Sequence, residues 1–147
     1  MIVLIDGRSG SGKTTLARML GAKFGVPVVH LDDFYPGWSG LARGSAMVVD
    51  VMTQRRFQMW DWDHDRPSTW VEVPHGDLII EGVGAVTRDS ISAAGAEVLT
   101  IFVEAPADVR KQRALRRDPE FQEHWDMWAA QEDQHFANFP SVDMIVR

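Results

Sequence analysis

The sequence contains no cysteine among its 147 residues. This absence excludes disulfide bonds, thiolate catalysis and zinc sites with cysteine ligands, and it is typical of the reducing cytoplasm. Apolar runs are short as well, because the longest candidates, 78–80 and 98–103, fall far below the roughly 20 residues of a membrane-spanning helix. No basic segment precedes the first apolar run, so no secretory signal is predicted. We therefore predict a cytoplasmic protein without a membrane segment.

Positive charge is scarce too. Lysine and arginine total 15 against 21 aspartates and glutamates, which gives a net charge of -6. A general nucleic-acid binder is usually basic, so a nucleic-acid partner is disfavoured. Four arginines nevertheless crowd into one short segment: Arg110, Arg113, Arg116 and Arg117. This cluster suits either a specific anionic ligand or a solvated helix face. Nothing in the sequence indicates an oligomeric state.

What the sequence does contain is an alternation of strand and helix patterns. Strands are predicted at 1–6, 26–31, 78–80, 98–103 and 142–146, and helices at 13–24, 46–59, 85–94, 107–117 and around 121–128. A loop is predicted at 33–46 and a short edge strand at 70–73. The chain is 45% hydrophobic, and its length fits a single domain, 1–147. The alternation predicts an α/β fold with a parallel sheet and helices on both faces.

Residues 7–14 read GRSGSGKT and match the phosphate-binding pattern G-x-x-x-x-G-K-[ST] in full. Glycines let backbone amides approach phosphate oxygens, and the helix that begins here adds the positive end of its dipole. Lys13 is expected to reach the β- and γ-phosphates, and Thr14 to offer its hydroxyl to Mg²⁺. The residues predicted to hold ATP are Gly7, Ser9, Gly10, Ser11, Gly12, Lys13, Thr14 and Thr15.

A dinucleotide-binding fold is the rival interpretation of the same stretch. It requires G-x-G-x-x-G after the strand and an acidic residue about 20 positions later. Asp32 lies near that separation, but the glycine spacing differs and Lys13 has no role in such a site. A plain glycine turn leaves the lysine and the threonines unexplained. The sequence therefore predicts a P-loop.

Two carboxylates follow predicted strands and are expected to face this loop. Asp32 ends the second strand and Glu81 the third, and ligands gather at the carboxyl ends of parallel strands. Phosphoryl transfer needs a group to deprotonate the acceptor hydroxyl and a metal ion on the phosphates. Asp32 suits the base, with a share in the metal site, and Glu81 suits the metal site, as does Thr14. The alternative for Asp32 is a helix cap or an Asx turn.

These segments together resemble a known family. The glycine loop, Leu31-Asp32-Asp33-Phe34-Tyr35, Ile80-Glu81-Gly82 and residues 107–118 are similar to the uridine kinase and nicotinamide riboside kinase group of P-loop kinases. The resemblance implies a three-layer P-loop NTPase fold with a parallel five-stranded sheet and helices on both faces. It also implies that Asp32 is the catalytic base, and that Tyr35, in the same D-x-F-Y pattern, lies at the substrate.

The arginine cluster falls on a predicted helix. At 3.6 residues per turn, Arg110, Arg113 and Arg117 share one face, and a row of guanidiniums suits phosphate oxygens. The resemblance implies a lid, about 110–138, that closes over the triphosphate. Arg113 and Arg117 are then expected to act in catalysis beside Lys13, and Arg110 to reach the acceptor. Arg116 is expected to be a bystander.

The most unusual segment is 60–67, WDWDHDRP. Aromatic faces with carboxylates suit a sugar or a base. Trp62, Asp63 and His64 resemble the first three residues of the F-D-H-P element of uridine kinases, which implies that they bind substrate. Packing by the tryptophans, with solvated acids, is an equally weighted alternative. A metal site built from His64 with its neighbouring aspartates is less favoured.

The function predicted from these motifs is transfer of the γ-phosphate of ATP to a hydroxyl of a small molecule, first a nucleoside-like riboside. A sugar, an antibiotic or a nucleotide is the alternative acceptor, and a nucleotide-dependent switch or ATPase acting on a protein is the alternative class. A GTPase is disfavoured because no N-K-x-D tetrapeptide occurs. Related kinases continue past the last strand into a loop over the adenine, whereas this chain ends at Arg147. Either loose base selectivity or a longer natural chain is expected.

Overall fold

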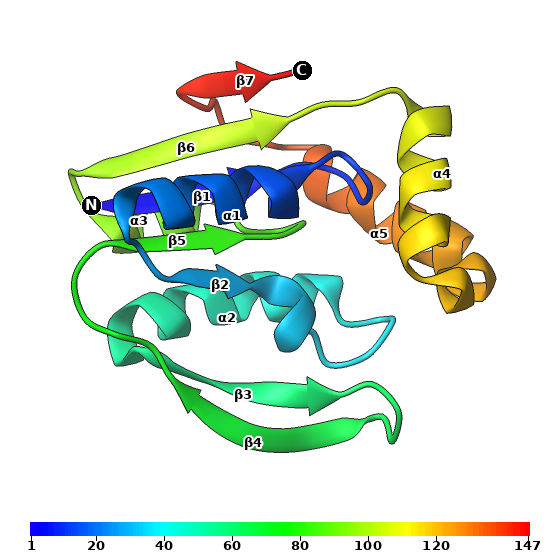
Figure 1. Cartoon of the computed structure of the whole chain (residues 1–147), viewed down its shortest axis with the longest axis horizontal. Helices are drawn as coiled ribbons and strands as arrows, with labels where there is room; N and C mark the ends of the chain where they lie inside the picture. The colour runs from blue at the N-terminus through cyan, green and yellow to red at the C-terminus, as the bar shows by residue number, and fades with distance from the viewer.

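The computed structural model describes all 147 residues, and a five-stranded sheet forms its centre (Figure 1). The strands are β1 (Ile2–Asp6), β2 (Val28–His30), β5 (Leu78–Glu81), β6 (Val98–Val103) and β7 (Met144–Val146). Their order is β2-β5-β1-β6-β7, and every neighbouring pair is parallel. The predicted parallel sheet is confirmed, and β1, which leads into the glycine loop, lies in its middle.

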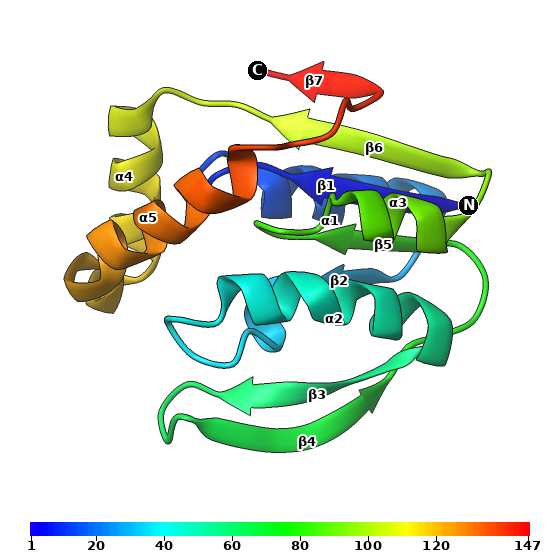
Figure 2. The same ribbon diagram turned by 180° about the vertical axis from the view of Figure 1, so that it is seen from behind.

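Helices cover both faces of this sheet, as predicted. They are α1 (Lys13–Phe24), α2 (Leu41–Gln54), α3 (Arg88–Ala94), α4 (Ala107–Arg117) and α5 (Trp125–Phe136), with short 3₁₀ helices η1 (Leu31–Asp33) and η2 (Pro119–His124). α1 lies over one face (Figure 1), whereas α2, α3 and α5 lie on the other (Figure 2). Successive side chains of β1 point to opposite faces of the sheet. Leu4 belongs to the larger core, and Ile5 packs with Ala17 of α1.

The segment after the second strand differs from the prediction. The helix expected at 46–59 begins earlier, at Leu41, and ends at Gln54. Arg55 then adopts a left-handed conformation with φ 55°, held by hydrogen bonds from its guanidinium to the carbonyls of Pro74 and Gly76. β3 (Arg56–Asp61) and β4 (Arg66–Glu72) follow as an antiparallel pair in a sheet of their own. The edge strand predicted at 70–73 is thus the end of a hairpin and adds nothing to the main sheet.

The predicted lid region contains three helices at the carboxyl ends of the strands. α4 leads through η2 into α5, and together they cross the end of the sheet beside the glycine loop (Figure 1). The side chain of Gln131 on α5 accepts a hydrogen bond from the Leu41 amide at 3.2 Å and donates one to the Trp38 carbonyl at 2.7 Å. This long-range cap explains why α2 begins five residues before the predicted start. No helix combines the length and apolar character that crossing a membrane requires.

Candidate active site

The glycine loop has the shape that its sequence predicts. It joins the end of β1 to the first residue of α1, so its amides lie at the positive end of a helix. Gly10 and Gly12 have φ angles of 79° and 104°, which favour glycine. At Gly10 an added Cβ would lie 2.1 Å from the carbonyl oxygen of Arg110, so any side chain there would collide with α4. Lys13 is buried and donates to the Arg8 carbonyl at 3.0 Å.

One cavity of about 250 Å³ opens between this loop, the end of β5 and α4. Most of the predicted catalytic, ATP-binding and metal residues line it, although they come from four separate segments. Its lining residues are Ser9, Gly10, Gly12, Lys13, Thr14, Thr15, Asp32, Glu81, Gly82, Val83, Arg113 and Arg117. The structure therefore brings a lysine, two carboxylates and two guanidiniums to a single place.

Glu81 and Thr14 are in direct contact at the floor of this cavity. The Thr14 hydroxyl donates to Glu81 Oε1 at 3.0 Å, and His30 Nδ1 lies 2.6 Å from the same oxygen. Burial acts to raise the pKa of Glu81, but the hydrogen bond with His30 and the charge of Lys13 outweigh it and lower the pKa. The same hydrogen bond raises the pKa of His30. Glu81 is therefore held as a carboxylate beside a hydroxyl, which is a donor set that suits Mg²⁺.

Sequence reasoning missed His30. No local sequence pattern marks His30, because its partner Glu81 lies 51 residues away. The pairing register of the strands is the signal that identifies His30, because His30 and Glu81 are paired across β2 and β5. Two residues at the carboxyl ends of adjacent parallel strands lie side by side whatever their distance in the chain.

Asp32 reaches the same cavity from η1. Asp32 is exposed at the cavity. Desolvation by neighbouring protein atoms, together with the nearby charge of Glu81, raises the pKa of Asp32, whereas Lys13 and Arg117 oppose the shift. The residue is thus a solvent-accessible carboxylate in the same cavity as the phosphate-binding lysine, a position that suits a proton acceptor.

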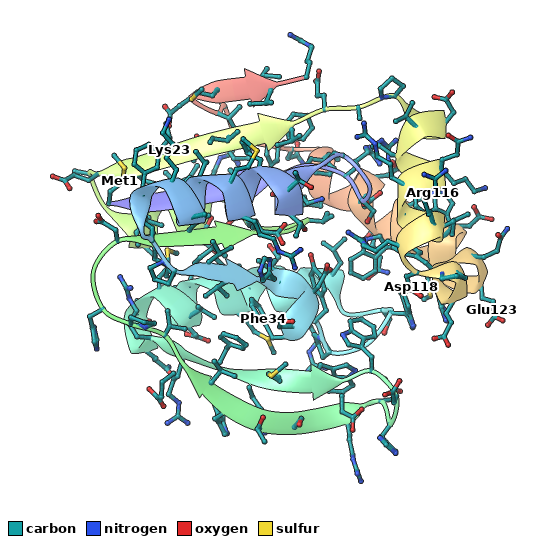
Figure 3. The ribbon with its side chains drawn as sticks, in the orientation of Figure 1. Met1, Lys23, Phe34, Arg116, Asp118 and Glu123 are labelled. Carbon is teal, nitrogen blue, oxygen red and sulfur yellow. The ribbon has the colours of Figure 1, made fainter.

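Arg113 and Arg110 both lie on α4 and contact carbonyls of the loop. Arg113 lines the cavity, and its Nη1 lies 3.4 Å from the Gly10 carbonyl. Arg110 donates to the carbonyls of Ala105 at 3.1 Å and Ser9 at 3.5 Å. It lines a separate, larger cavity, and the predicted contact of Arg110 with the acceptor stays a prediction. Arg116, labelled on α4 in Figure 3, is exposed and lines neither of these cavities, and its lack of a catalytic role stays a prediction.

The second cavity lies on the other side of the P-loop and has a volume of about 1040 Å³. Its wall combines the loop and α1 with the end of β6 and the start of α4. Apolar side chains contribute much of it: Leu16, Met19, Phe102, Val103, Pro106 and Val146. Ser11 lines this cavity, and its hydroxyl is buried without a hydrogen-bond partner.

Tyr35 does not face either cavity, so its predicted contact with substrate was wrong. Its hydroxyl donates to the Val83 carbonyl at 2.6 Å, and only 1% of the residue is exposed. The ring packs edge-on against Trp128, with centroids 4.9 Å apart. Tyr35 instead links the end of η1 to the segment that follows Glu81. The D-x-F-Y pattern alone does not show that its side chain points into the core.

The hairpin turn contributes one residue to the neighbourhood of Asp32. Trp62 Nε1 donates to the Asp32 carbonyl at 2.9 Å. His64 and Asp63 both bond to the Asp61 carboxylate, and neither lines the cavity. Trp62 does not line the cavity either, so the substrate role of these three residues stays a prediction.

Trp38 joins this turn to the lid region. Its ring lies 5.0 Å from that of Trp62 and 5.0 Å from that of Phe121, measured between centroids. It stacks on His124 at 4.2 Å with an interplanar angle of 9°. Aromatic contacts thus hold three segments together beside the catalytic cavity: the hairpin turn, the loop that precedes α2, and η2.

The fold and this site define a P-loop kinase, a phosphotransferase enzyme. No established protein-family profile matches the chain. It is 30% identical over 118 residues to the cytidylate kinase of Methanothermobacter thermautotrophicus, covering 80% of this chain and 69% of that protein. The chain belongs to the family of P-loop kinases that includes this enzyme. The cytidylate kinase of Methanopyrus kandleri is 27% identical over 124 residues, and there the match covers 63% of the relative.

Solved structures agree on the fold. A possible uridine kinase from Bacillus stearothermophilus superposes with a TM-score of 0.60 at 17% identity, covering 100% of this chain and 88% of that one. Shikimate kinase from Bacteroides thetaiotaomicron gives 0.59 at 20% identity, covering 99% and 85%. The predicted kinase class is confirmed, whereas the narrower likeness to uridine kinases remains a prediction.

Proposed function

We propose that the protein transfers the γ-phosphate of ATP to a hydroxyl of a small molecule, with a nucleoside or nucleoside-like riboside as the first candidate acceptor. The observation that carries this proposal is the single cavity shared by Lys13, Thr14, Asp32, Glu81, Arg113 and Arg117. Each chemical part that phosphoryl transfer requires is present there within one small volume.

Asp32 is the proposed general base. The acceptor hydroxyl gives its proton to the Asp32 carboxylate while its oxygen forms a bond to the γ-phosphorus, and ADP leaves with the electrons of the broken P–O bond. A raised pKa makes this carboxylate a better proton acceptor than an aspartate with an ordinary pKa. Arg113 and Arg117 are proposed to stabilise the charge that develops on the transferring group.

Thr14 and Glu81 are the proposed holders of Mg²⁺, and their contact at 3.0 Å supports this role. When bound, Mg²⁺ neutralises the phosphate oxygens and orients them for transfer. Glu81 lies close enough to Asp32 for its charge to raise the pKa of Asp32, and Asp32 is a further candidate ligand. His30 keeps Glu81 ionised through its hydrogen bond and so supports the same site.

The larger cavity is the proposed place of the nucleoside part of ATP. It adjoins the P-loop at Ser11 and Gly12, where a chain of phosphates would pass from one cavity to the other. Apolar side chains such as Leu16 and Met19 suit a planar base. Arg110 then contacts the nucleotide side, which is the proposed reason for its position.

The identity of the acceptor is open to a direct test, because two observations favour different molecules. Trp62 beside Asp32 supports a riboside whose ring packs on an indole. The 30% identity to a cytidylate kinase favours a nucleoside monophosphate as the second candidate. Release of ADP should be measured with cytidine, uridine, other ribosides and sugars, and in parallel with CMP and UMP. Turnover with nucleosides supports the first candidate, and a preference for CMP replaces it with the second. If no compound exceeds water, a nucleotide-dependent switch or ATPase becomes the better explanation.

A further inference from the structure

α5 carries a buried carboxylate for which the proposed reaction has no use. Glu132 is only 1% exposed, and its Oε2 accepts a hydrogen bond from the Ser9 amide at 2.7 Å. The nearest cation, Arg8, lies 3.9 Å from Glu132 and makes its short contact with Asp133 instead, at 2.8 Å. A buried negative charge therefore faces the phosphate-binding loop, and its short hydrogen bond is made to a backbone amide of that loop.

Such an arrangement is costly. A carboxylate loses its hydration on burial, and an apolar side chain of similar size would pack the same space at less expense. The charge also stands close to the place where the loop is to bind a polyanion. A residue that served only to pack α5 against the sheet has no reason to be a glutamate.

The partners of Ser9 show what the carboxylate does. Glu132 binds the amide of Ser9, and Arg110 lies 3.5 Å from the carbonyl of the same residue. Arg113 approaches the next carbonyl, that of Gly10, at 3.4 Å. The first half of the loop is thus held by α4 and α5, and Ser9 and Gly10 line the cavity together with Gly12 and Lys13.

A second contact fixes α5 in this position. His135 Nε2 lies 2.9 Å from Asp6 Oδ2, and Asp6 is fully buried. The Asp6 carboxylate also accepts hydrogen bonds from the amides of Gly7 at 2.7 Å and Val86 at 2.9 Å. Through Asp6, α5 is therefore connected both to the start of the P-loop and to the segment that follows Glu81.

We propose that Glu132 is a positioning residue for nucleotide binding. Its carboxylate fixes the Arg8–Ser9 peptide in one orientation, so that the amides further along the loop are already arranged for the β- and γ-phosphates. The inference rests on the proposed binding of ATP by this P-loop, but it does not depend on the acceptor. The proposal also implies that the end of α5 stays in place during turnover, because a helix that holds the loop cannot move away from it.

The test compares Glu132→Met with Glu132→Gln by calorimetric titration of ATP and ADP into the whole chain. Methionine keeps the volume but its sulfur is only a weak acceptor for the Ser9 amide, whereas glutamine keeps an accepting oxygen. We expect the Kd for both nucleotides to rise roughly ten-fold in Glu132→Met and to stay within about three-fold of the wild type in Glu132→Gln. Asp133→Ala is the matched control, because Asp133 is exposed and pairs only with Arg8; its Kd should not change.

Thermal unfolding separates positioning from packing. Glu132→Met leaves the Ser9 amide without its acceptor, which costs about 1–3 kcal/mol, so its melting temperature should fall by less than about 10 °C and the chain should stay folded during the titration. Unchanged nucleotide affinity in Glu132→Met would overturn the inference, and so would a loss of affinity in Glu132→Gln as large as in Glu132→Met. If Glu132→Met does not fold, a wild-type Kd in Glu132→Gln together with a ten-fold loss in Glu132→Ala still supports it. A wild-type chain that binds no ATP refutes the proposed function instead.

Discussion

Replacing Asp32 with asparagine tests the proposed chemistry most directly. Asp32→Asn preserves the size of the side chain and leaves the backbone carbonyl that Trp62 binds at 2.9 Å. It removes the only proposed proton acceptor, and general-base catalysis contributes roughly 10²- to 10⁴-fold to a rate. We therefore expect kcat to fall by about that factor. Because Asp32 adds negative charge near the site of a polyphosphate, its loss should leave the Kd for ATP unchanged or slightly lower.

The assay is coupled detection of ADP with the best acceptor from the screen, both substrates being saturating, and ATP binding is measured separately by calorimetry. Asp33→Asn is the matched control, since Asp33 is the next residue in η1 but does not line the cavity. Its kcat should remain within about two-fold of the wild type. Retention of more than about one fifth of the wild-type kcat by Asp32→Asn would remove Asp32 from the role of base.

Three other substitutions give distinct outcomes. Lys13→Ala removes the cation of the P-loop and should weaken ATP binding in a calorimetric titration; unchanged affinity would contradict the proposed loop. Arg113→Ala should lower kcat by roughly ten-fold or more with a smaller change in ATP affinity, as expected of a group that acts in the transition state; an unchanged kcat would make it a surface charge. Tyr35→Phe leaves the Val83 carbonyl without its donor and should lower the free energy of unfolding by about 1–2 kcal/mol in urea denaturation. Its affinity for ATP should stay the same, and a loss of affinity would return Tyr35 to the binding site.

The P-loop and the residues around it could be predicted because their signals are local. The glycine spacing needs only eight consecutive residues, and Asp32 and Glu81 follow apolar runs that read as strands. The rule that strand ends meet at one edge of a parallel sheet then places both acids beside Lys13. The cavity they share follows from that rule, although its residues are spread from Ser9 to Arg117.

The remaining contacts depend on tertiary structure and leave no local pattern. Glu132 lies 123 residues from its partner Ser9, and nothing in the sequence of α5 separates it from the exposed acids around it. The helix predicted at 46–59 took in residues 56–59, which belong to β3 instead. The left-handed Arg55, which ends α2 there, is held by carbonyls near residue 75 that are distant in sequence.

The position of Trp38 makes the protein its own optical probe. The indole touches rings from the hairpin turn and from η2, including the imidazole of His124 stacked at 4.2 Å. Any ligand that moves η2 or Trp62 changes the surroundings of this indole and thus its ultraviolet emission. Unknown acceptors can therefore be titrated by fluorescence without waiting for turnover, which lets binding be scored even for compounds that the enzyme does not phosphorylate.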